Sequence, residues 1–109
     1  MNSTLTVTSS PIEGGANVSL SGSLVSMNAL DLKSELHKHI NKRQKLVVDI
    51  TNVTDIDLTG LNTLMFTKVK CSLKYSEMVI VVSDGHPIMK LLRLTRSEGQ
   101  FKIQKPILT

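Results

Sequence analysis

Aromatic residues and cysteine are scarce in this chain of 109 residues, which has no Trp, one Tyr, two Phe and one Cys. So few aromatic rings argue against a surface that stacks nucleobases or sugars. The single thiol, Cys71, cannot form a disulfide within the chain, which suits a reducing compartment. We expect Cys71 to be a small apolar residue on a helix, in a core built from Leu, Val, Ile and Met.

Long hydrophobic runs are also absent, because no stretch approaches the roughly 20 apolar residues of a membrane-spanning helix. The first ten residues contain neither the basic nor the apolar segment of a signal peptide. We therefore expect a cytosolic protein without membrane insertion. The net charge is +4, and much of the positive excess lies at the end of one predicted helix. Cations at a helix C-terminus stabilise the helix dipole, so this cluster is interpreted as a solvated helix end and nucleic-acid binding is not predicted. The cations concerned are Lys38, Lys42, Arg43 and Lys45.

Recognised catalytic and phosphate-binding patterns are missing: there is no GxGxxG, Walker loop, HExxH, GxSxG or cysteine pair. His37 and His39 have no carboxylate or cysteine at a metal-ligand spacing, so we expect both on the surface. Asp55, Asp57 and His86 form an alternative set for a cation or a reaction, but the two carboxylates have no third ligand near them in sequence. The sequence therefore predicts no metal, no cofactor and no enzymatic activity.

Hydrophobic periodicity predicts three helices and up to five strands. Alternating residues near 5–8 and 18–22, separated by Pro11 and a Gly pair, predict a hairpin. Strands are predicted at 46–50 and 78–82, and a last edge strand from Phe101 extends towards Ile107. Helices are predicted at 28–40 with Asn28 as the cap, at 60–73, and at 87–95 with Pro87 in the first turn.

This order predicts one α/β domain over residues 1–109. The expected sheet is mostly parallel and four- to five-stranded, with an antiparallel N-terminal edge and three to four helices. The predicted core is Leu32, Leu36, Val48, Ile50, Leu64, Val79, Val81 and Leu91. The helix at 60–73 is expected to turn Leu61, Leu64, Met65, Val69 and Leu73 towards the sheet.

The segment 47–61 combines a buried strand, a polar turn and a helix start. In an α/β sheet, such a junction lies at the carboxyl edge, where helix amides and loop side chains meet a ligand or partner. We therefore predict that the functional surface lies here.

Two short motifs resemble those of the STAS domain in bacterial anti-sigma factor antagonists. That family commonly carries Leu-x-Gly-x-Leu-Asp before its first helix, and here the segment is Leu20-Ser21-Gly22-Ser23-Leu24-Val25. After a later strand the family has Asp, a hydroxyl residue, then Ser, Thr or Ala, Gly and Leu, which corresponds to Asp57-Leu58-Thr59-Gly60-Leu61. The resemblance covers about residues 5 to 105 and agrees with the predicted order of elements.

The resemblance implies a regulator that binds an anti-sigma factor or kinase-like protein. The residues that it implies for partner binding are Asp57, Leu58, Thr59, Gly60, Leu61 and Leu64. Leu58 stands where the family has its phosphoacceptor, and Val25 replaces an Asp, which predicts binding without the usual phosphorylation switch. Thr59 offers a hydroxyl one position later. An alternative role is a STAS subunit or scaffold of a larger assembly, such as a bacterial lipid-transport or stress-sensing complex. The residues define no oligomeric state.

Overall fold

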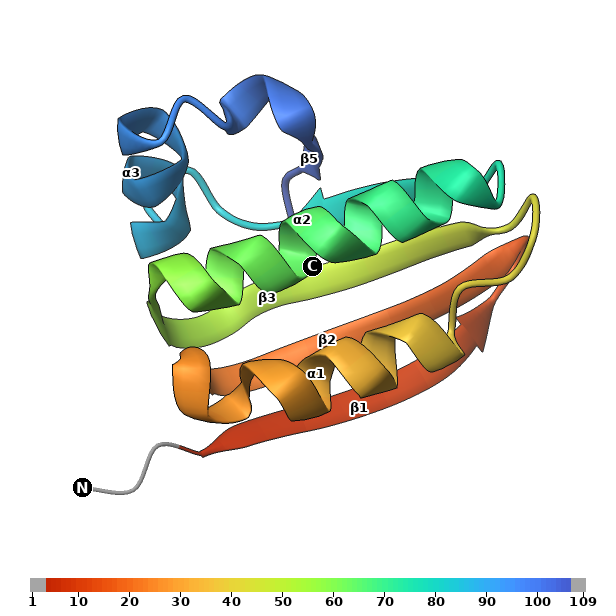
Figure 1. The fold of residues 1–109 in the computed structure, drawn as a ribbon, viewed down its shortest axis with the longest axis horizontal. Coiled ribbons are helices and arrows are strands. Elements are labelled where there is room, and N and C mark those ends of the chain that lie inside the picture. Colours follow the sequence, from red (N-terminus) through yellow and green to blue (C-terminus); the bar gives the residue numbers. More distant parts are fainter. Residues whose placement is uncertain (1–3, 107–109) are drawn as a thin grey trace.

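The computed structural model describes residues 4–106, which form one mixed sheet with helices packed on it (Figure 1). The strands are β1 (Leu5–Ile12), β2 (Gly15–Leu24), β3 (Lys45–Ile56), β4 (Glu77–Val81) and β5 (Lys102–Gln104). The helices are α1 (Ser26–Lys38), α2 (Leu58–Leu73), α3 (Pro87–Leu94) and the short 3-10 helix η1 (Glu98–Gln100).

The sheet has the strand order β1-β2-β3-β4-β5. β1 pairs with β2 antiparallel and every later pair is parallel, so the predicted fold class is confirmed. The hairpin differs in one detail, because β1 continues through Pro11, which was expected to end it. A proline is tolerated there because β1 is an edge strand and needs hydrogen bonds on one side only.

α1 and α2 lie side by side on one face of the sheet and cover its middle strands (Figure 1). Alternate strand residues such as Val18, Val48 and Ile80 point towards them and are fully buried. The other buried strand side chains on this side include Leu20, Leu46, Ile50, Met78 and Val82. Most of the predicted core is confirmed, but Val81 and Leu91 are only partly buried.

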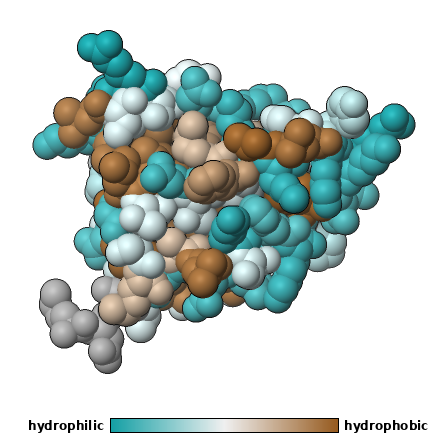
Figure 2. Space-filling view, in the orientation of Figure 1, coloured by the Kyte–Doolittle hydropathy of each residue, from teal (hydrophilic) through white to brown (hydrophobic). Residues whose placement is uncertain are grey.

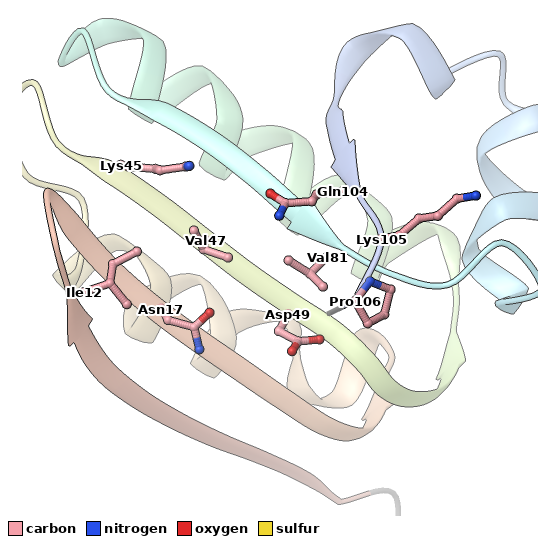
Figure 3. Close-up of a pocket in the computed structure, with 9 residues that line it drawn as sticks. All are labelled: Ile12, Asn17, Lys45, Val47, Asp49, Val81, Gln104, Lys105 and Pro106. Atoms are coloured by element: carbon pink, nitrogen blue, oxygen red, sulfur yellow. The ribbon is translucent and has the colours of Figure 1, made fainter. Parts of the chain in front are cut away.

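The opposite face of the sheet carries the remaining strand side chains (Figure 3). A hollow of about 420 Å³ lies on this face, and its lining includes Ile12, Asn17, Val47, Asp49, Val81 and Gln104. The carboxylate of Asp49 accepts a hydrogen bond from the Thr51 N–H at 2.9 Å. The Asp49 carboxylate is therefore bonded within β3 itself. The polar turns that join strands to helices lie outside this hollow.

The predicted buried stripe of α2 is confirmed at Leu61 and Leu64 but wrong at Val69 and Leu73, which are exposed. The face towards the sheet and α1 uses small residues, including Thr63, Thr67 and Cys71. The Thr67 hydroxyl donates to the Thr63 carbonyl at 2.8 Å, so a polar side chain is buried without losing its hydrogen bond. A pattern that counts only large apolar residues therefore misses this face.

Two element boundaries also differ from those predicted. β3 continues to Ile56 through a stretch expected to be a turn, because β2 pairs with it up to that residue. α1 begins at Ser26, so Asn28 lies inside its first turn and donates to the Ser23 carbonyl at 2.8 Å instead of capping the helix. At the other end of the chain β5 is a short edge strand as expected, and the proposed extension to Ile107 lies outside the described residues.

α3 is attached to the sheet through its N-cap residue, His86, which is buried. The His86 Nδ1 accepts the Ile88 N–H at 3.1 Å, so the ring proton is on Nε2, which donates to the Val53 carbonyl at 2.6 Å. Ile88 and Leu92 complete the attachment by entering the core. The ring therefore joins the start of α3 to β3.

Candidate functional site

The candidate site is the place where the β2–α1 and β3–α2 junctions meet. Because β2 and β3 are parallel neighbours, both strands end at the same edge of the sheet. The Asp57 N–H donates to the Leu24 carbonyl at 3.3 Å, which holds the two junctions together. The two motifs identified in the sequence are thus in contact, as the left-hand end of the helix layer in Figure 1 shows.

Asp57 caps both helices with one carboxylate. Its Oδ1 accepts the Gly60 N–H at 2.8 Å, which caps α2 in the expected way. Its Oδ2 accepts the N–H of Ser26, the first residue of α1, at 3.0 Å. The residue before α1 is Val25, which has no oxygen for a cap, so Asp57 supplies the acceptor from the other junction.

A second carboxylate reinforces the contact between the junctions. Asp55 Oδ2 accepts a hydrogen bond from the Ser23 hydroxyl at 3.0 Å and a longer one from Thr54 Oγ1 at 3.4 Å. Thr54 Oγ1 also lies 3.3 Å from the Gly22 carbonyl. These contacts are exposed, so they position the loops more than they stabilise the fold.

Both motif glycines are required by close backbone contacts. Gly22 has a φ of 106°, and a Cβ there would lie 2.2 Å from the carbonyl oxygen of Thr4, the residue before β1. A Cβ on Gly60 would lie 2.2 Å from the Leu24 carbonyl oxygen. The glycines therefore let the junctions approach each other and the edge strand.

Of the six residues implied for partner binding, Leu58 and Thr59 are exposed and Asp57 is partly buried. Leu58 has 55% of its surface exposed at the first position of α2. Gly60, Leu61 and Leu64 are buried, so they support the surface from beneath.

The alternative set of Asp55, Asp57 and His86 does not form a cation site. Both oxygens of Asp57 accept backbone N–H groups, and Asp55 accepts hydroxyls. His86 is used by Ile88 and Val53. Within residues 4–106, no group of three or more His, Cys, Asp or Glu residues is placed to hold a metal ion.

Other titratable side chains lie away from this edge. Cys71 is buried as expected, and burial raises the pKa of its thiol to about 11, although the charge of Lys74 acts in the opposite direction. His37 and His39, which were expected on the surface, are each partly buried. Burial, and then the positive charges of three lysines, lower the pKa of His37.

Sequence reasoning missed the partners of Asp57 at the β2–α1 junction, namely the Ser26 N–H and the Leu24 carbonyl. A signal was present, because Val25 precedes the helix without a capping oxygen. The carboxylate that replaces this cap comes from a position far along the chain, and only the sheet order brings it near.

The fold is that of a small α/β domain in which two parallel strands end in abutting strand–helix junctions. The STAS domain family model matches residues 9–106, and the chain belongs to this family. The structure is similar to the crystal structure of an anti-sigma factor antagonist from Mycobacterium paratuberculosis, with a TM-score of 0.82 and 22% sequence identity over 96% of this chain and 88% of that chain. It is also similar to SpoIIAA, an anti-sigma factor antagonist in its unphosphorylated form, with a TM-score of 0.65 and 9% identity over 97% of this chain and 90% of that one.

Among the described residues, no helix is long and apolar enough to cross a bilayer.

Proposed function

We propose that this protein is a non-enzymatic regulator that binds an anti-sigma factor or kinase-like protein through the surface around Asp57–Leu64. Membership of the STAS family and the fold shared with two anti-sigma factor antagonists support this assignment. The observation that carries it is Leu58, a large apolar side chain that is 55% exposed at the start of α2. An exposed leucine in the first turn of a helix is a suitable anchor for a protein partner.

The second part of the proposal is that binding is not switched by phosphorylation at the usual position. Leu58 has no hydroxyl to accept a phosphate. Thr59 is exposed and has one, but side chains of successive helix residues diverge by about 100°, so a kinase arranged for position 58 would not align its γ-phosphate with Thr59. A partner that is released by phosphate repulsion in other proteins would stay bound here.

The binding test is calorimetry with the partner recovered from the native host. Leu58→Asp is expected to weaken binding by more than about 2 kcal/mol, because a charge would be buried without a pair. The variant should fold normally, since an acidic residue in the first turn of a helix is favourable. Alanine at both Lys42 and Arg43 is the matched control, and a loss as large as that of Leu58→Asp would refute the assignment of the surface.

The phosphorylation test is incubation with a cognate kinase and ATP, followed by intact-mass analysis. The wild-type chain should remain unmodified, while Leu58→Ser gains a phosphate. Stoichiometric modification of wild-type Thr59 at the rate of the variant would show that the switch has moved by one residue. Recovery of a transporter ATPase as the partner would favour the larger-assembly alternative.

A further inference from the structure

The end of the molecule opposite the candidate site combines positive charge with exposed apolar side chains. We call it the basic end, and its residues are Lys42, Arg43, Lys70, Leu73 and Tyr75. Figure 1 places the α1–β3 and α2–β4 turns next to each other at the right-hand end of the sheet. The Arg43 N–H donates to the Lys74 carbonyl at 3.0 Å, so the two turns are physically joined.

Positive charge at the basic end is largely uncompensated. The chain has no Asp or Glu between residues 36 and 48, or between residues 58 and 76. In the part of the chain that the structure describes, no carboxylate lies within 4.0 Å of the side-chain nitrogens of Lys42, Arg43 or Lys70. The neighbouring acids Glu35 and Glu77 are already paired, with Lys38 at 2.8 Å and Lys102 at 2.7 Å.

Within residues 4–106, Glu13 on the turn between β1 and β2 is an acid at this end of the sheet that forms none of the ion pairs found there. Its turn is joined to the start of β3, where the Lys45 N–H donates to the Gly14 carbonyl at 2.8 Å. Lys45 therefore lies beside that turn. The excess of cations over acids persists when Glu13 is counted.

Large apolar side chains project among these cations. Leu73 is 72% exposed and Tyr75 is 77% exposed, and Val69 lies one turn earlier on the same side of α2. Figure 2 shows hydrophobic side chains along this helix layer, interspersed with hydrophilic ones. Cations with long aliphatic stems beside projecting apolar residues are the composition that binds the interface of an anionic membrane.

The exposed Tyr75 has a left-handed backbone, which Arg43 at the same end and Arg96 after α3 share. Tyr75 follows the C-cap of α2 with a φ of 56°, a left-handed conformation that favours glycine. The Ser76 N–H closes the turn by donating to the Cys71 carbonyl at 2.8 Å. A glycine would make the same turn with less strain, and the exposed ring gains little from packing within the protein.

We propose that the basic end is a peripheral docking surface for anionic phospholipid headgroups. Its cations bind the phosphates, and the Leu73 and Tyr75 side chains enter the headgroup layer without crossing it. A lipid surface fits better than an acidic protein, because both turns protrude from the sheet and a fluid headgroup layer needs no matching hollow. α2 has 16 residues, so about 24 Å separates its two ends, and the docked protein would hold Leu58 away from the lipid.

The first test is flotation of the full chain with vesicles of phosphatidylcholine alone and of phosphatidylcholine mixed with phosphatidylglycerol. We expect binding to the anionic vesicles only, weakened by salt. Charge reversal at both Lys42 and Arg43 should lower the affinity at least about tenfold. Glutamate at both Lys90 and Arg93, exposed cations of α3 at the other end, is the matched control and should bind to the same extent as the wild type.

Tyr75→Gly separates docking from folding. The variant should raise the melting temperature and weaken vesicle binding, opposite effects that misfolding cannot produce. Leu73→Ser should also weaken binding, whereas Leu94→Ser, which alters a side chain with the same 72% exposure on α3, should not. Because Tyr75 is the only tyrosine and tryptophan is absent, intrinsic fluorescence reports this residue alone. Anionic vesicles should reduce its quenching by acrylamide.

Several outcomes would overturn the proposal. They are equal binding to neutral vesicles, no binding to anionic vesicles at low salt, equal losses in the α3 controls, and unchanged acrylamide quenching. Binding of an acidic polypeptide without binding of vesicles would identify the basic end as a site for an acidic protein instead. None of these results bears on Leu58, so the proposed regulatory function is tested separately.

Discussion

A methyl group added to Gly60 would lie 2.2 Å from the carbonyl oxygen of Leu24. This close approach is what brings the start of α2 against the end of β2. The surface around Leu58 therefore depends on a contact between two segments that are far apart in sequence.

Gly60→Ala is expected to destabilise the fold by about 2–3 kcal/mol, because either the Leu24 backbone or the start of α2 must move. Urea unfolding measures the change. Gly99→Ala is the matched control, since a Cβ there would meet nothing within 4 Å, and it should change stability by less than about 0.5 kcal/mol. Similar urea midpoints for the two variants would show that the backbone around Gly60 and Leu24 can move apart at little cost in stability.

Asp57→Ala should cost about 2–4 kcal/mol, because it removes the caps of α1 and α2 at once. Asp57→Asn should cost about half as much, since its amide oxygen can still accept the Gly60 N–H while its amide nitrogen faces the Ser26 N–H. Asp55→Asn provides an exposed control with an expected loss under about 1 kcal/mol. Chemical denaturation measures the stability of the three variants. If Asp57→Asn were as unstable as Asp57→Ala, the two oxygens of Asp57 would not cap the two helices independently.

His37 should make stability depend on pH. Burial, followed by Lys33, Lys70 and Lys74, lowers the pKa of His37 below its ordinary value of 6.5. The unfolded chain therefore takes up a proton at a higher pH than the native chain, and the free energy of unfolding falls as the pH drops below about 6.5. His37→Gln should flatten this part of the profile in thermal melts. A slope that is unchanged in the variant would assign the effect to other groups.

Cys71 should be unreactive in the native protein, because it is buried and its thiol pKa is raised to about 11. At pH 8 only about a thousandth of the thiol is ionised. Labelling by a thiol reagent should therefore be slow and should accelerate in urea. A chain with Cys71→Ala and Ser72→Cys places the thiol on an exposed neighbour and should react quickly. Equal rates for the two proteins would show that α2 opens readily.

The order of the elements and the mostly parallel sheet could be predicted, because strands such as 46–50, interrupted only by Asp49, and 78–82 are apolar runs separated by helical spacing. The buried side of α2 could not. Val69 and Leu73 fit the helical period as well as the buried residues do, although both are exposed. Thr63 and Thr67 are polar and were not predicted to be buried, but each hydroxyl donates to the carbonyl four residues earlier in α2. Apolar character alone does not separate an exposed binding residue from a buried one.

For the candidate site, the sequence predicted the strand–turn–helix junction at Asp57, which an α/β sheet places at the carboxyl edge of its parallel strands. That a partner binds there stays a prediction. The length of β3 was underestimated because its last residues are mostly polar, and pairing with β2 holds them in the sheet. The second cap made by Asp57 depends on that pairing, so no local pattern around Ser26 could identify it.

The acceptor for the first amide of α1 lies 31 residues further along the chain. During synthesis, Ser26 is added before Asp57, so the start of α1 has no capping carboxylate until that residue follows. Closing this long loop costs entropy that only the completed β2–β3 pairing offsets. A nascent chain that ends at Ile56 thus lacks more than α2, because it also lacks the residue that completes the start of α1.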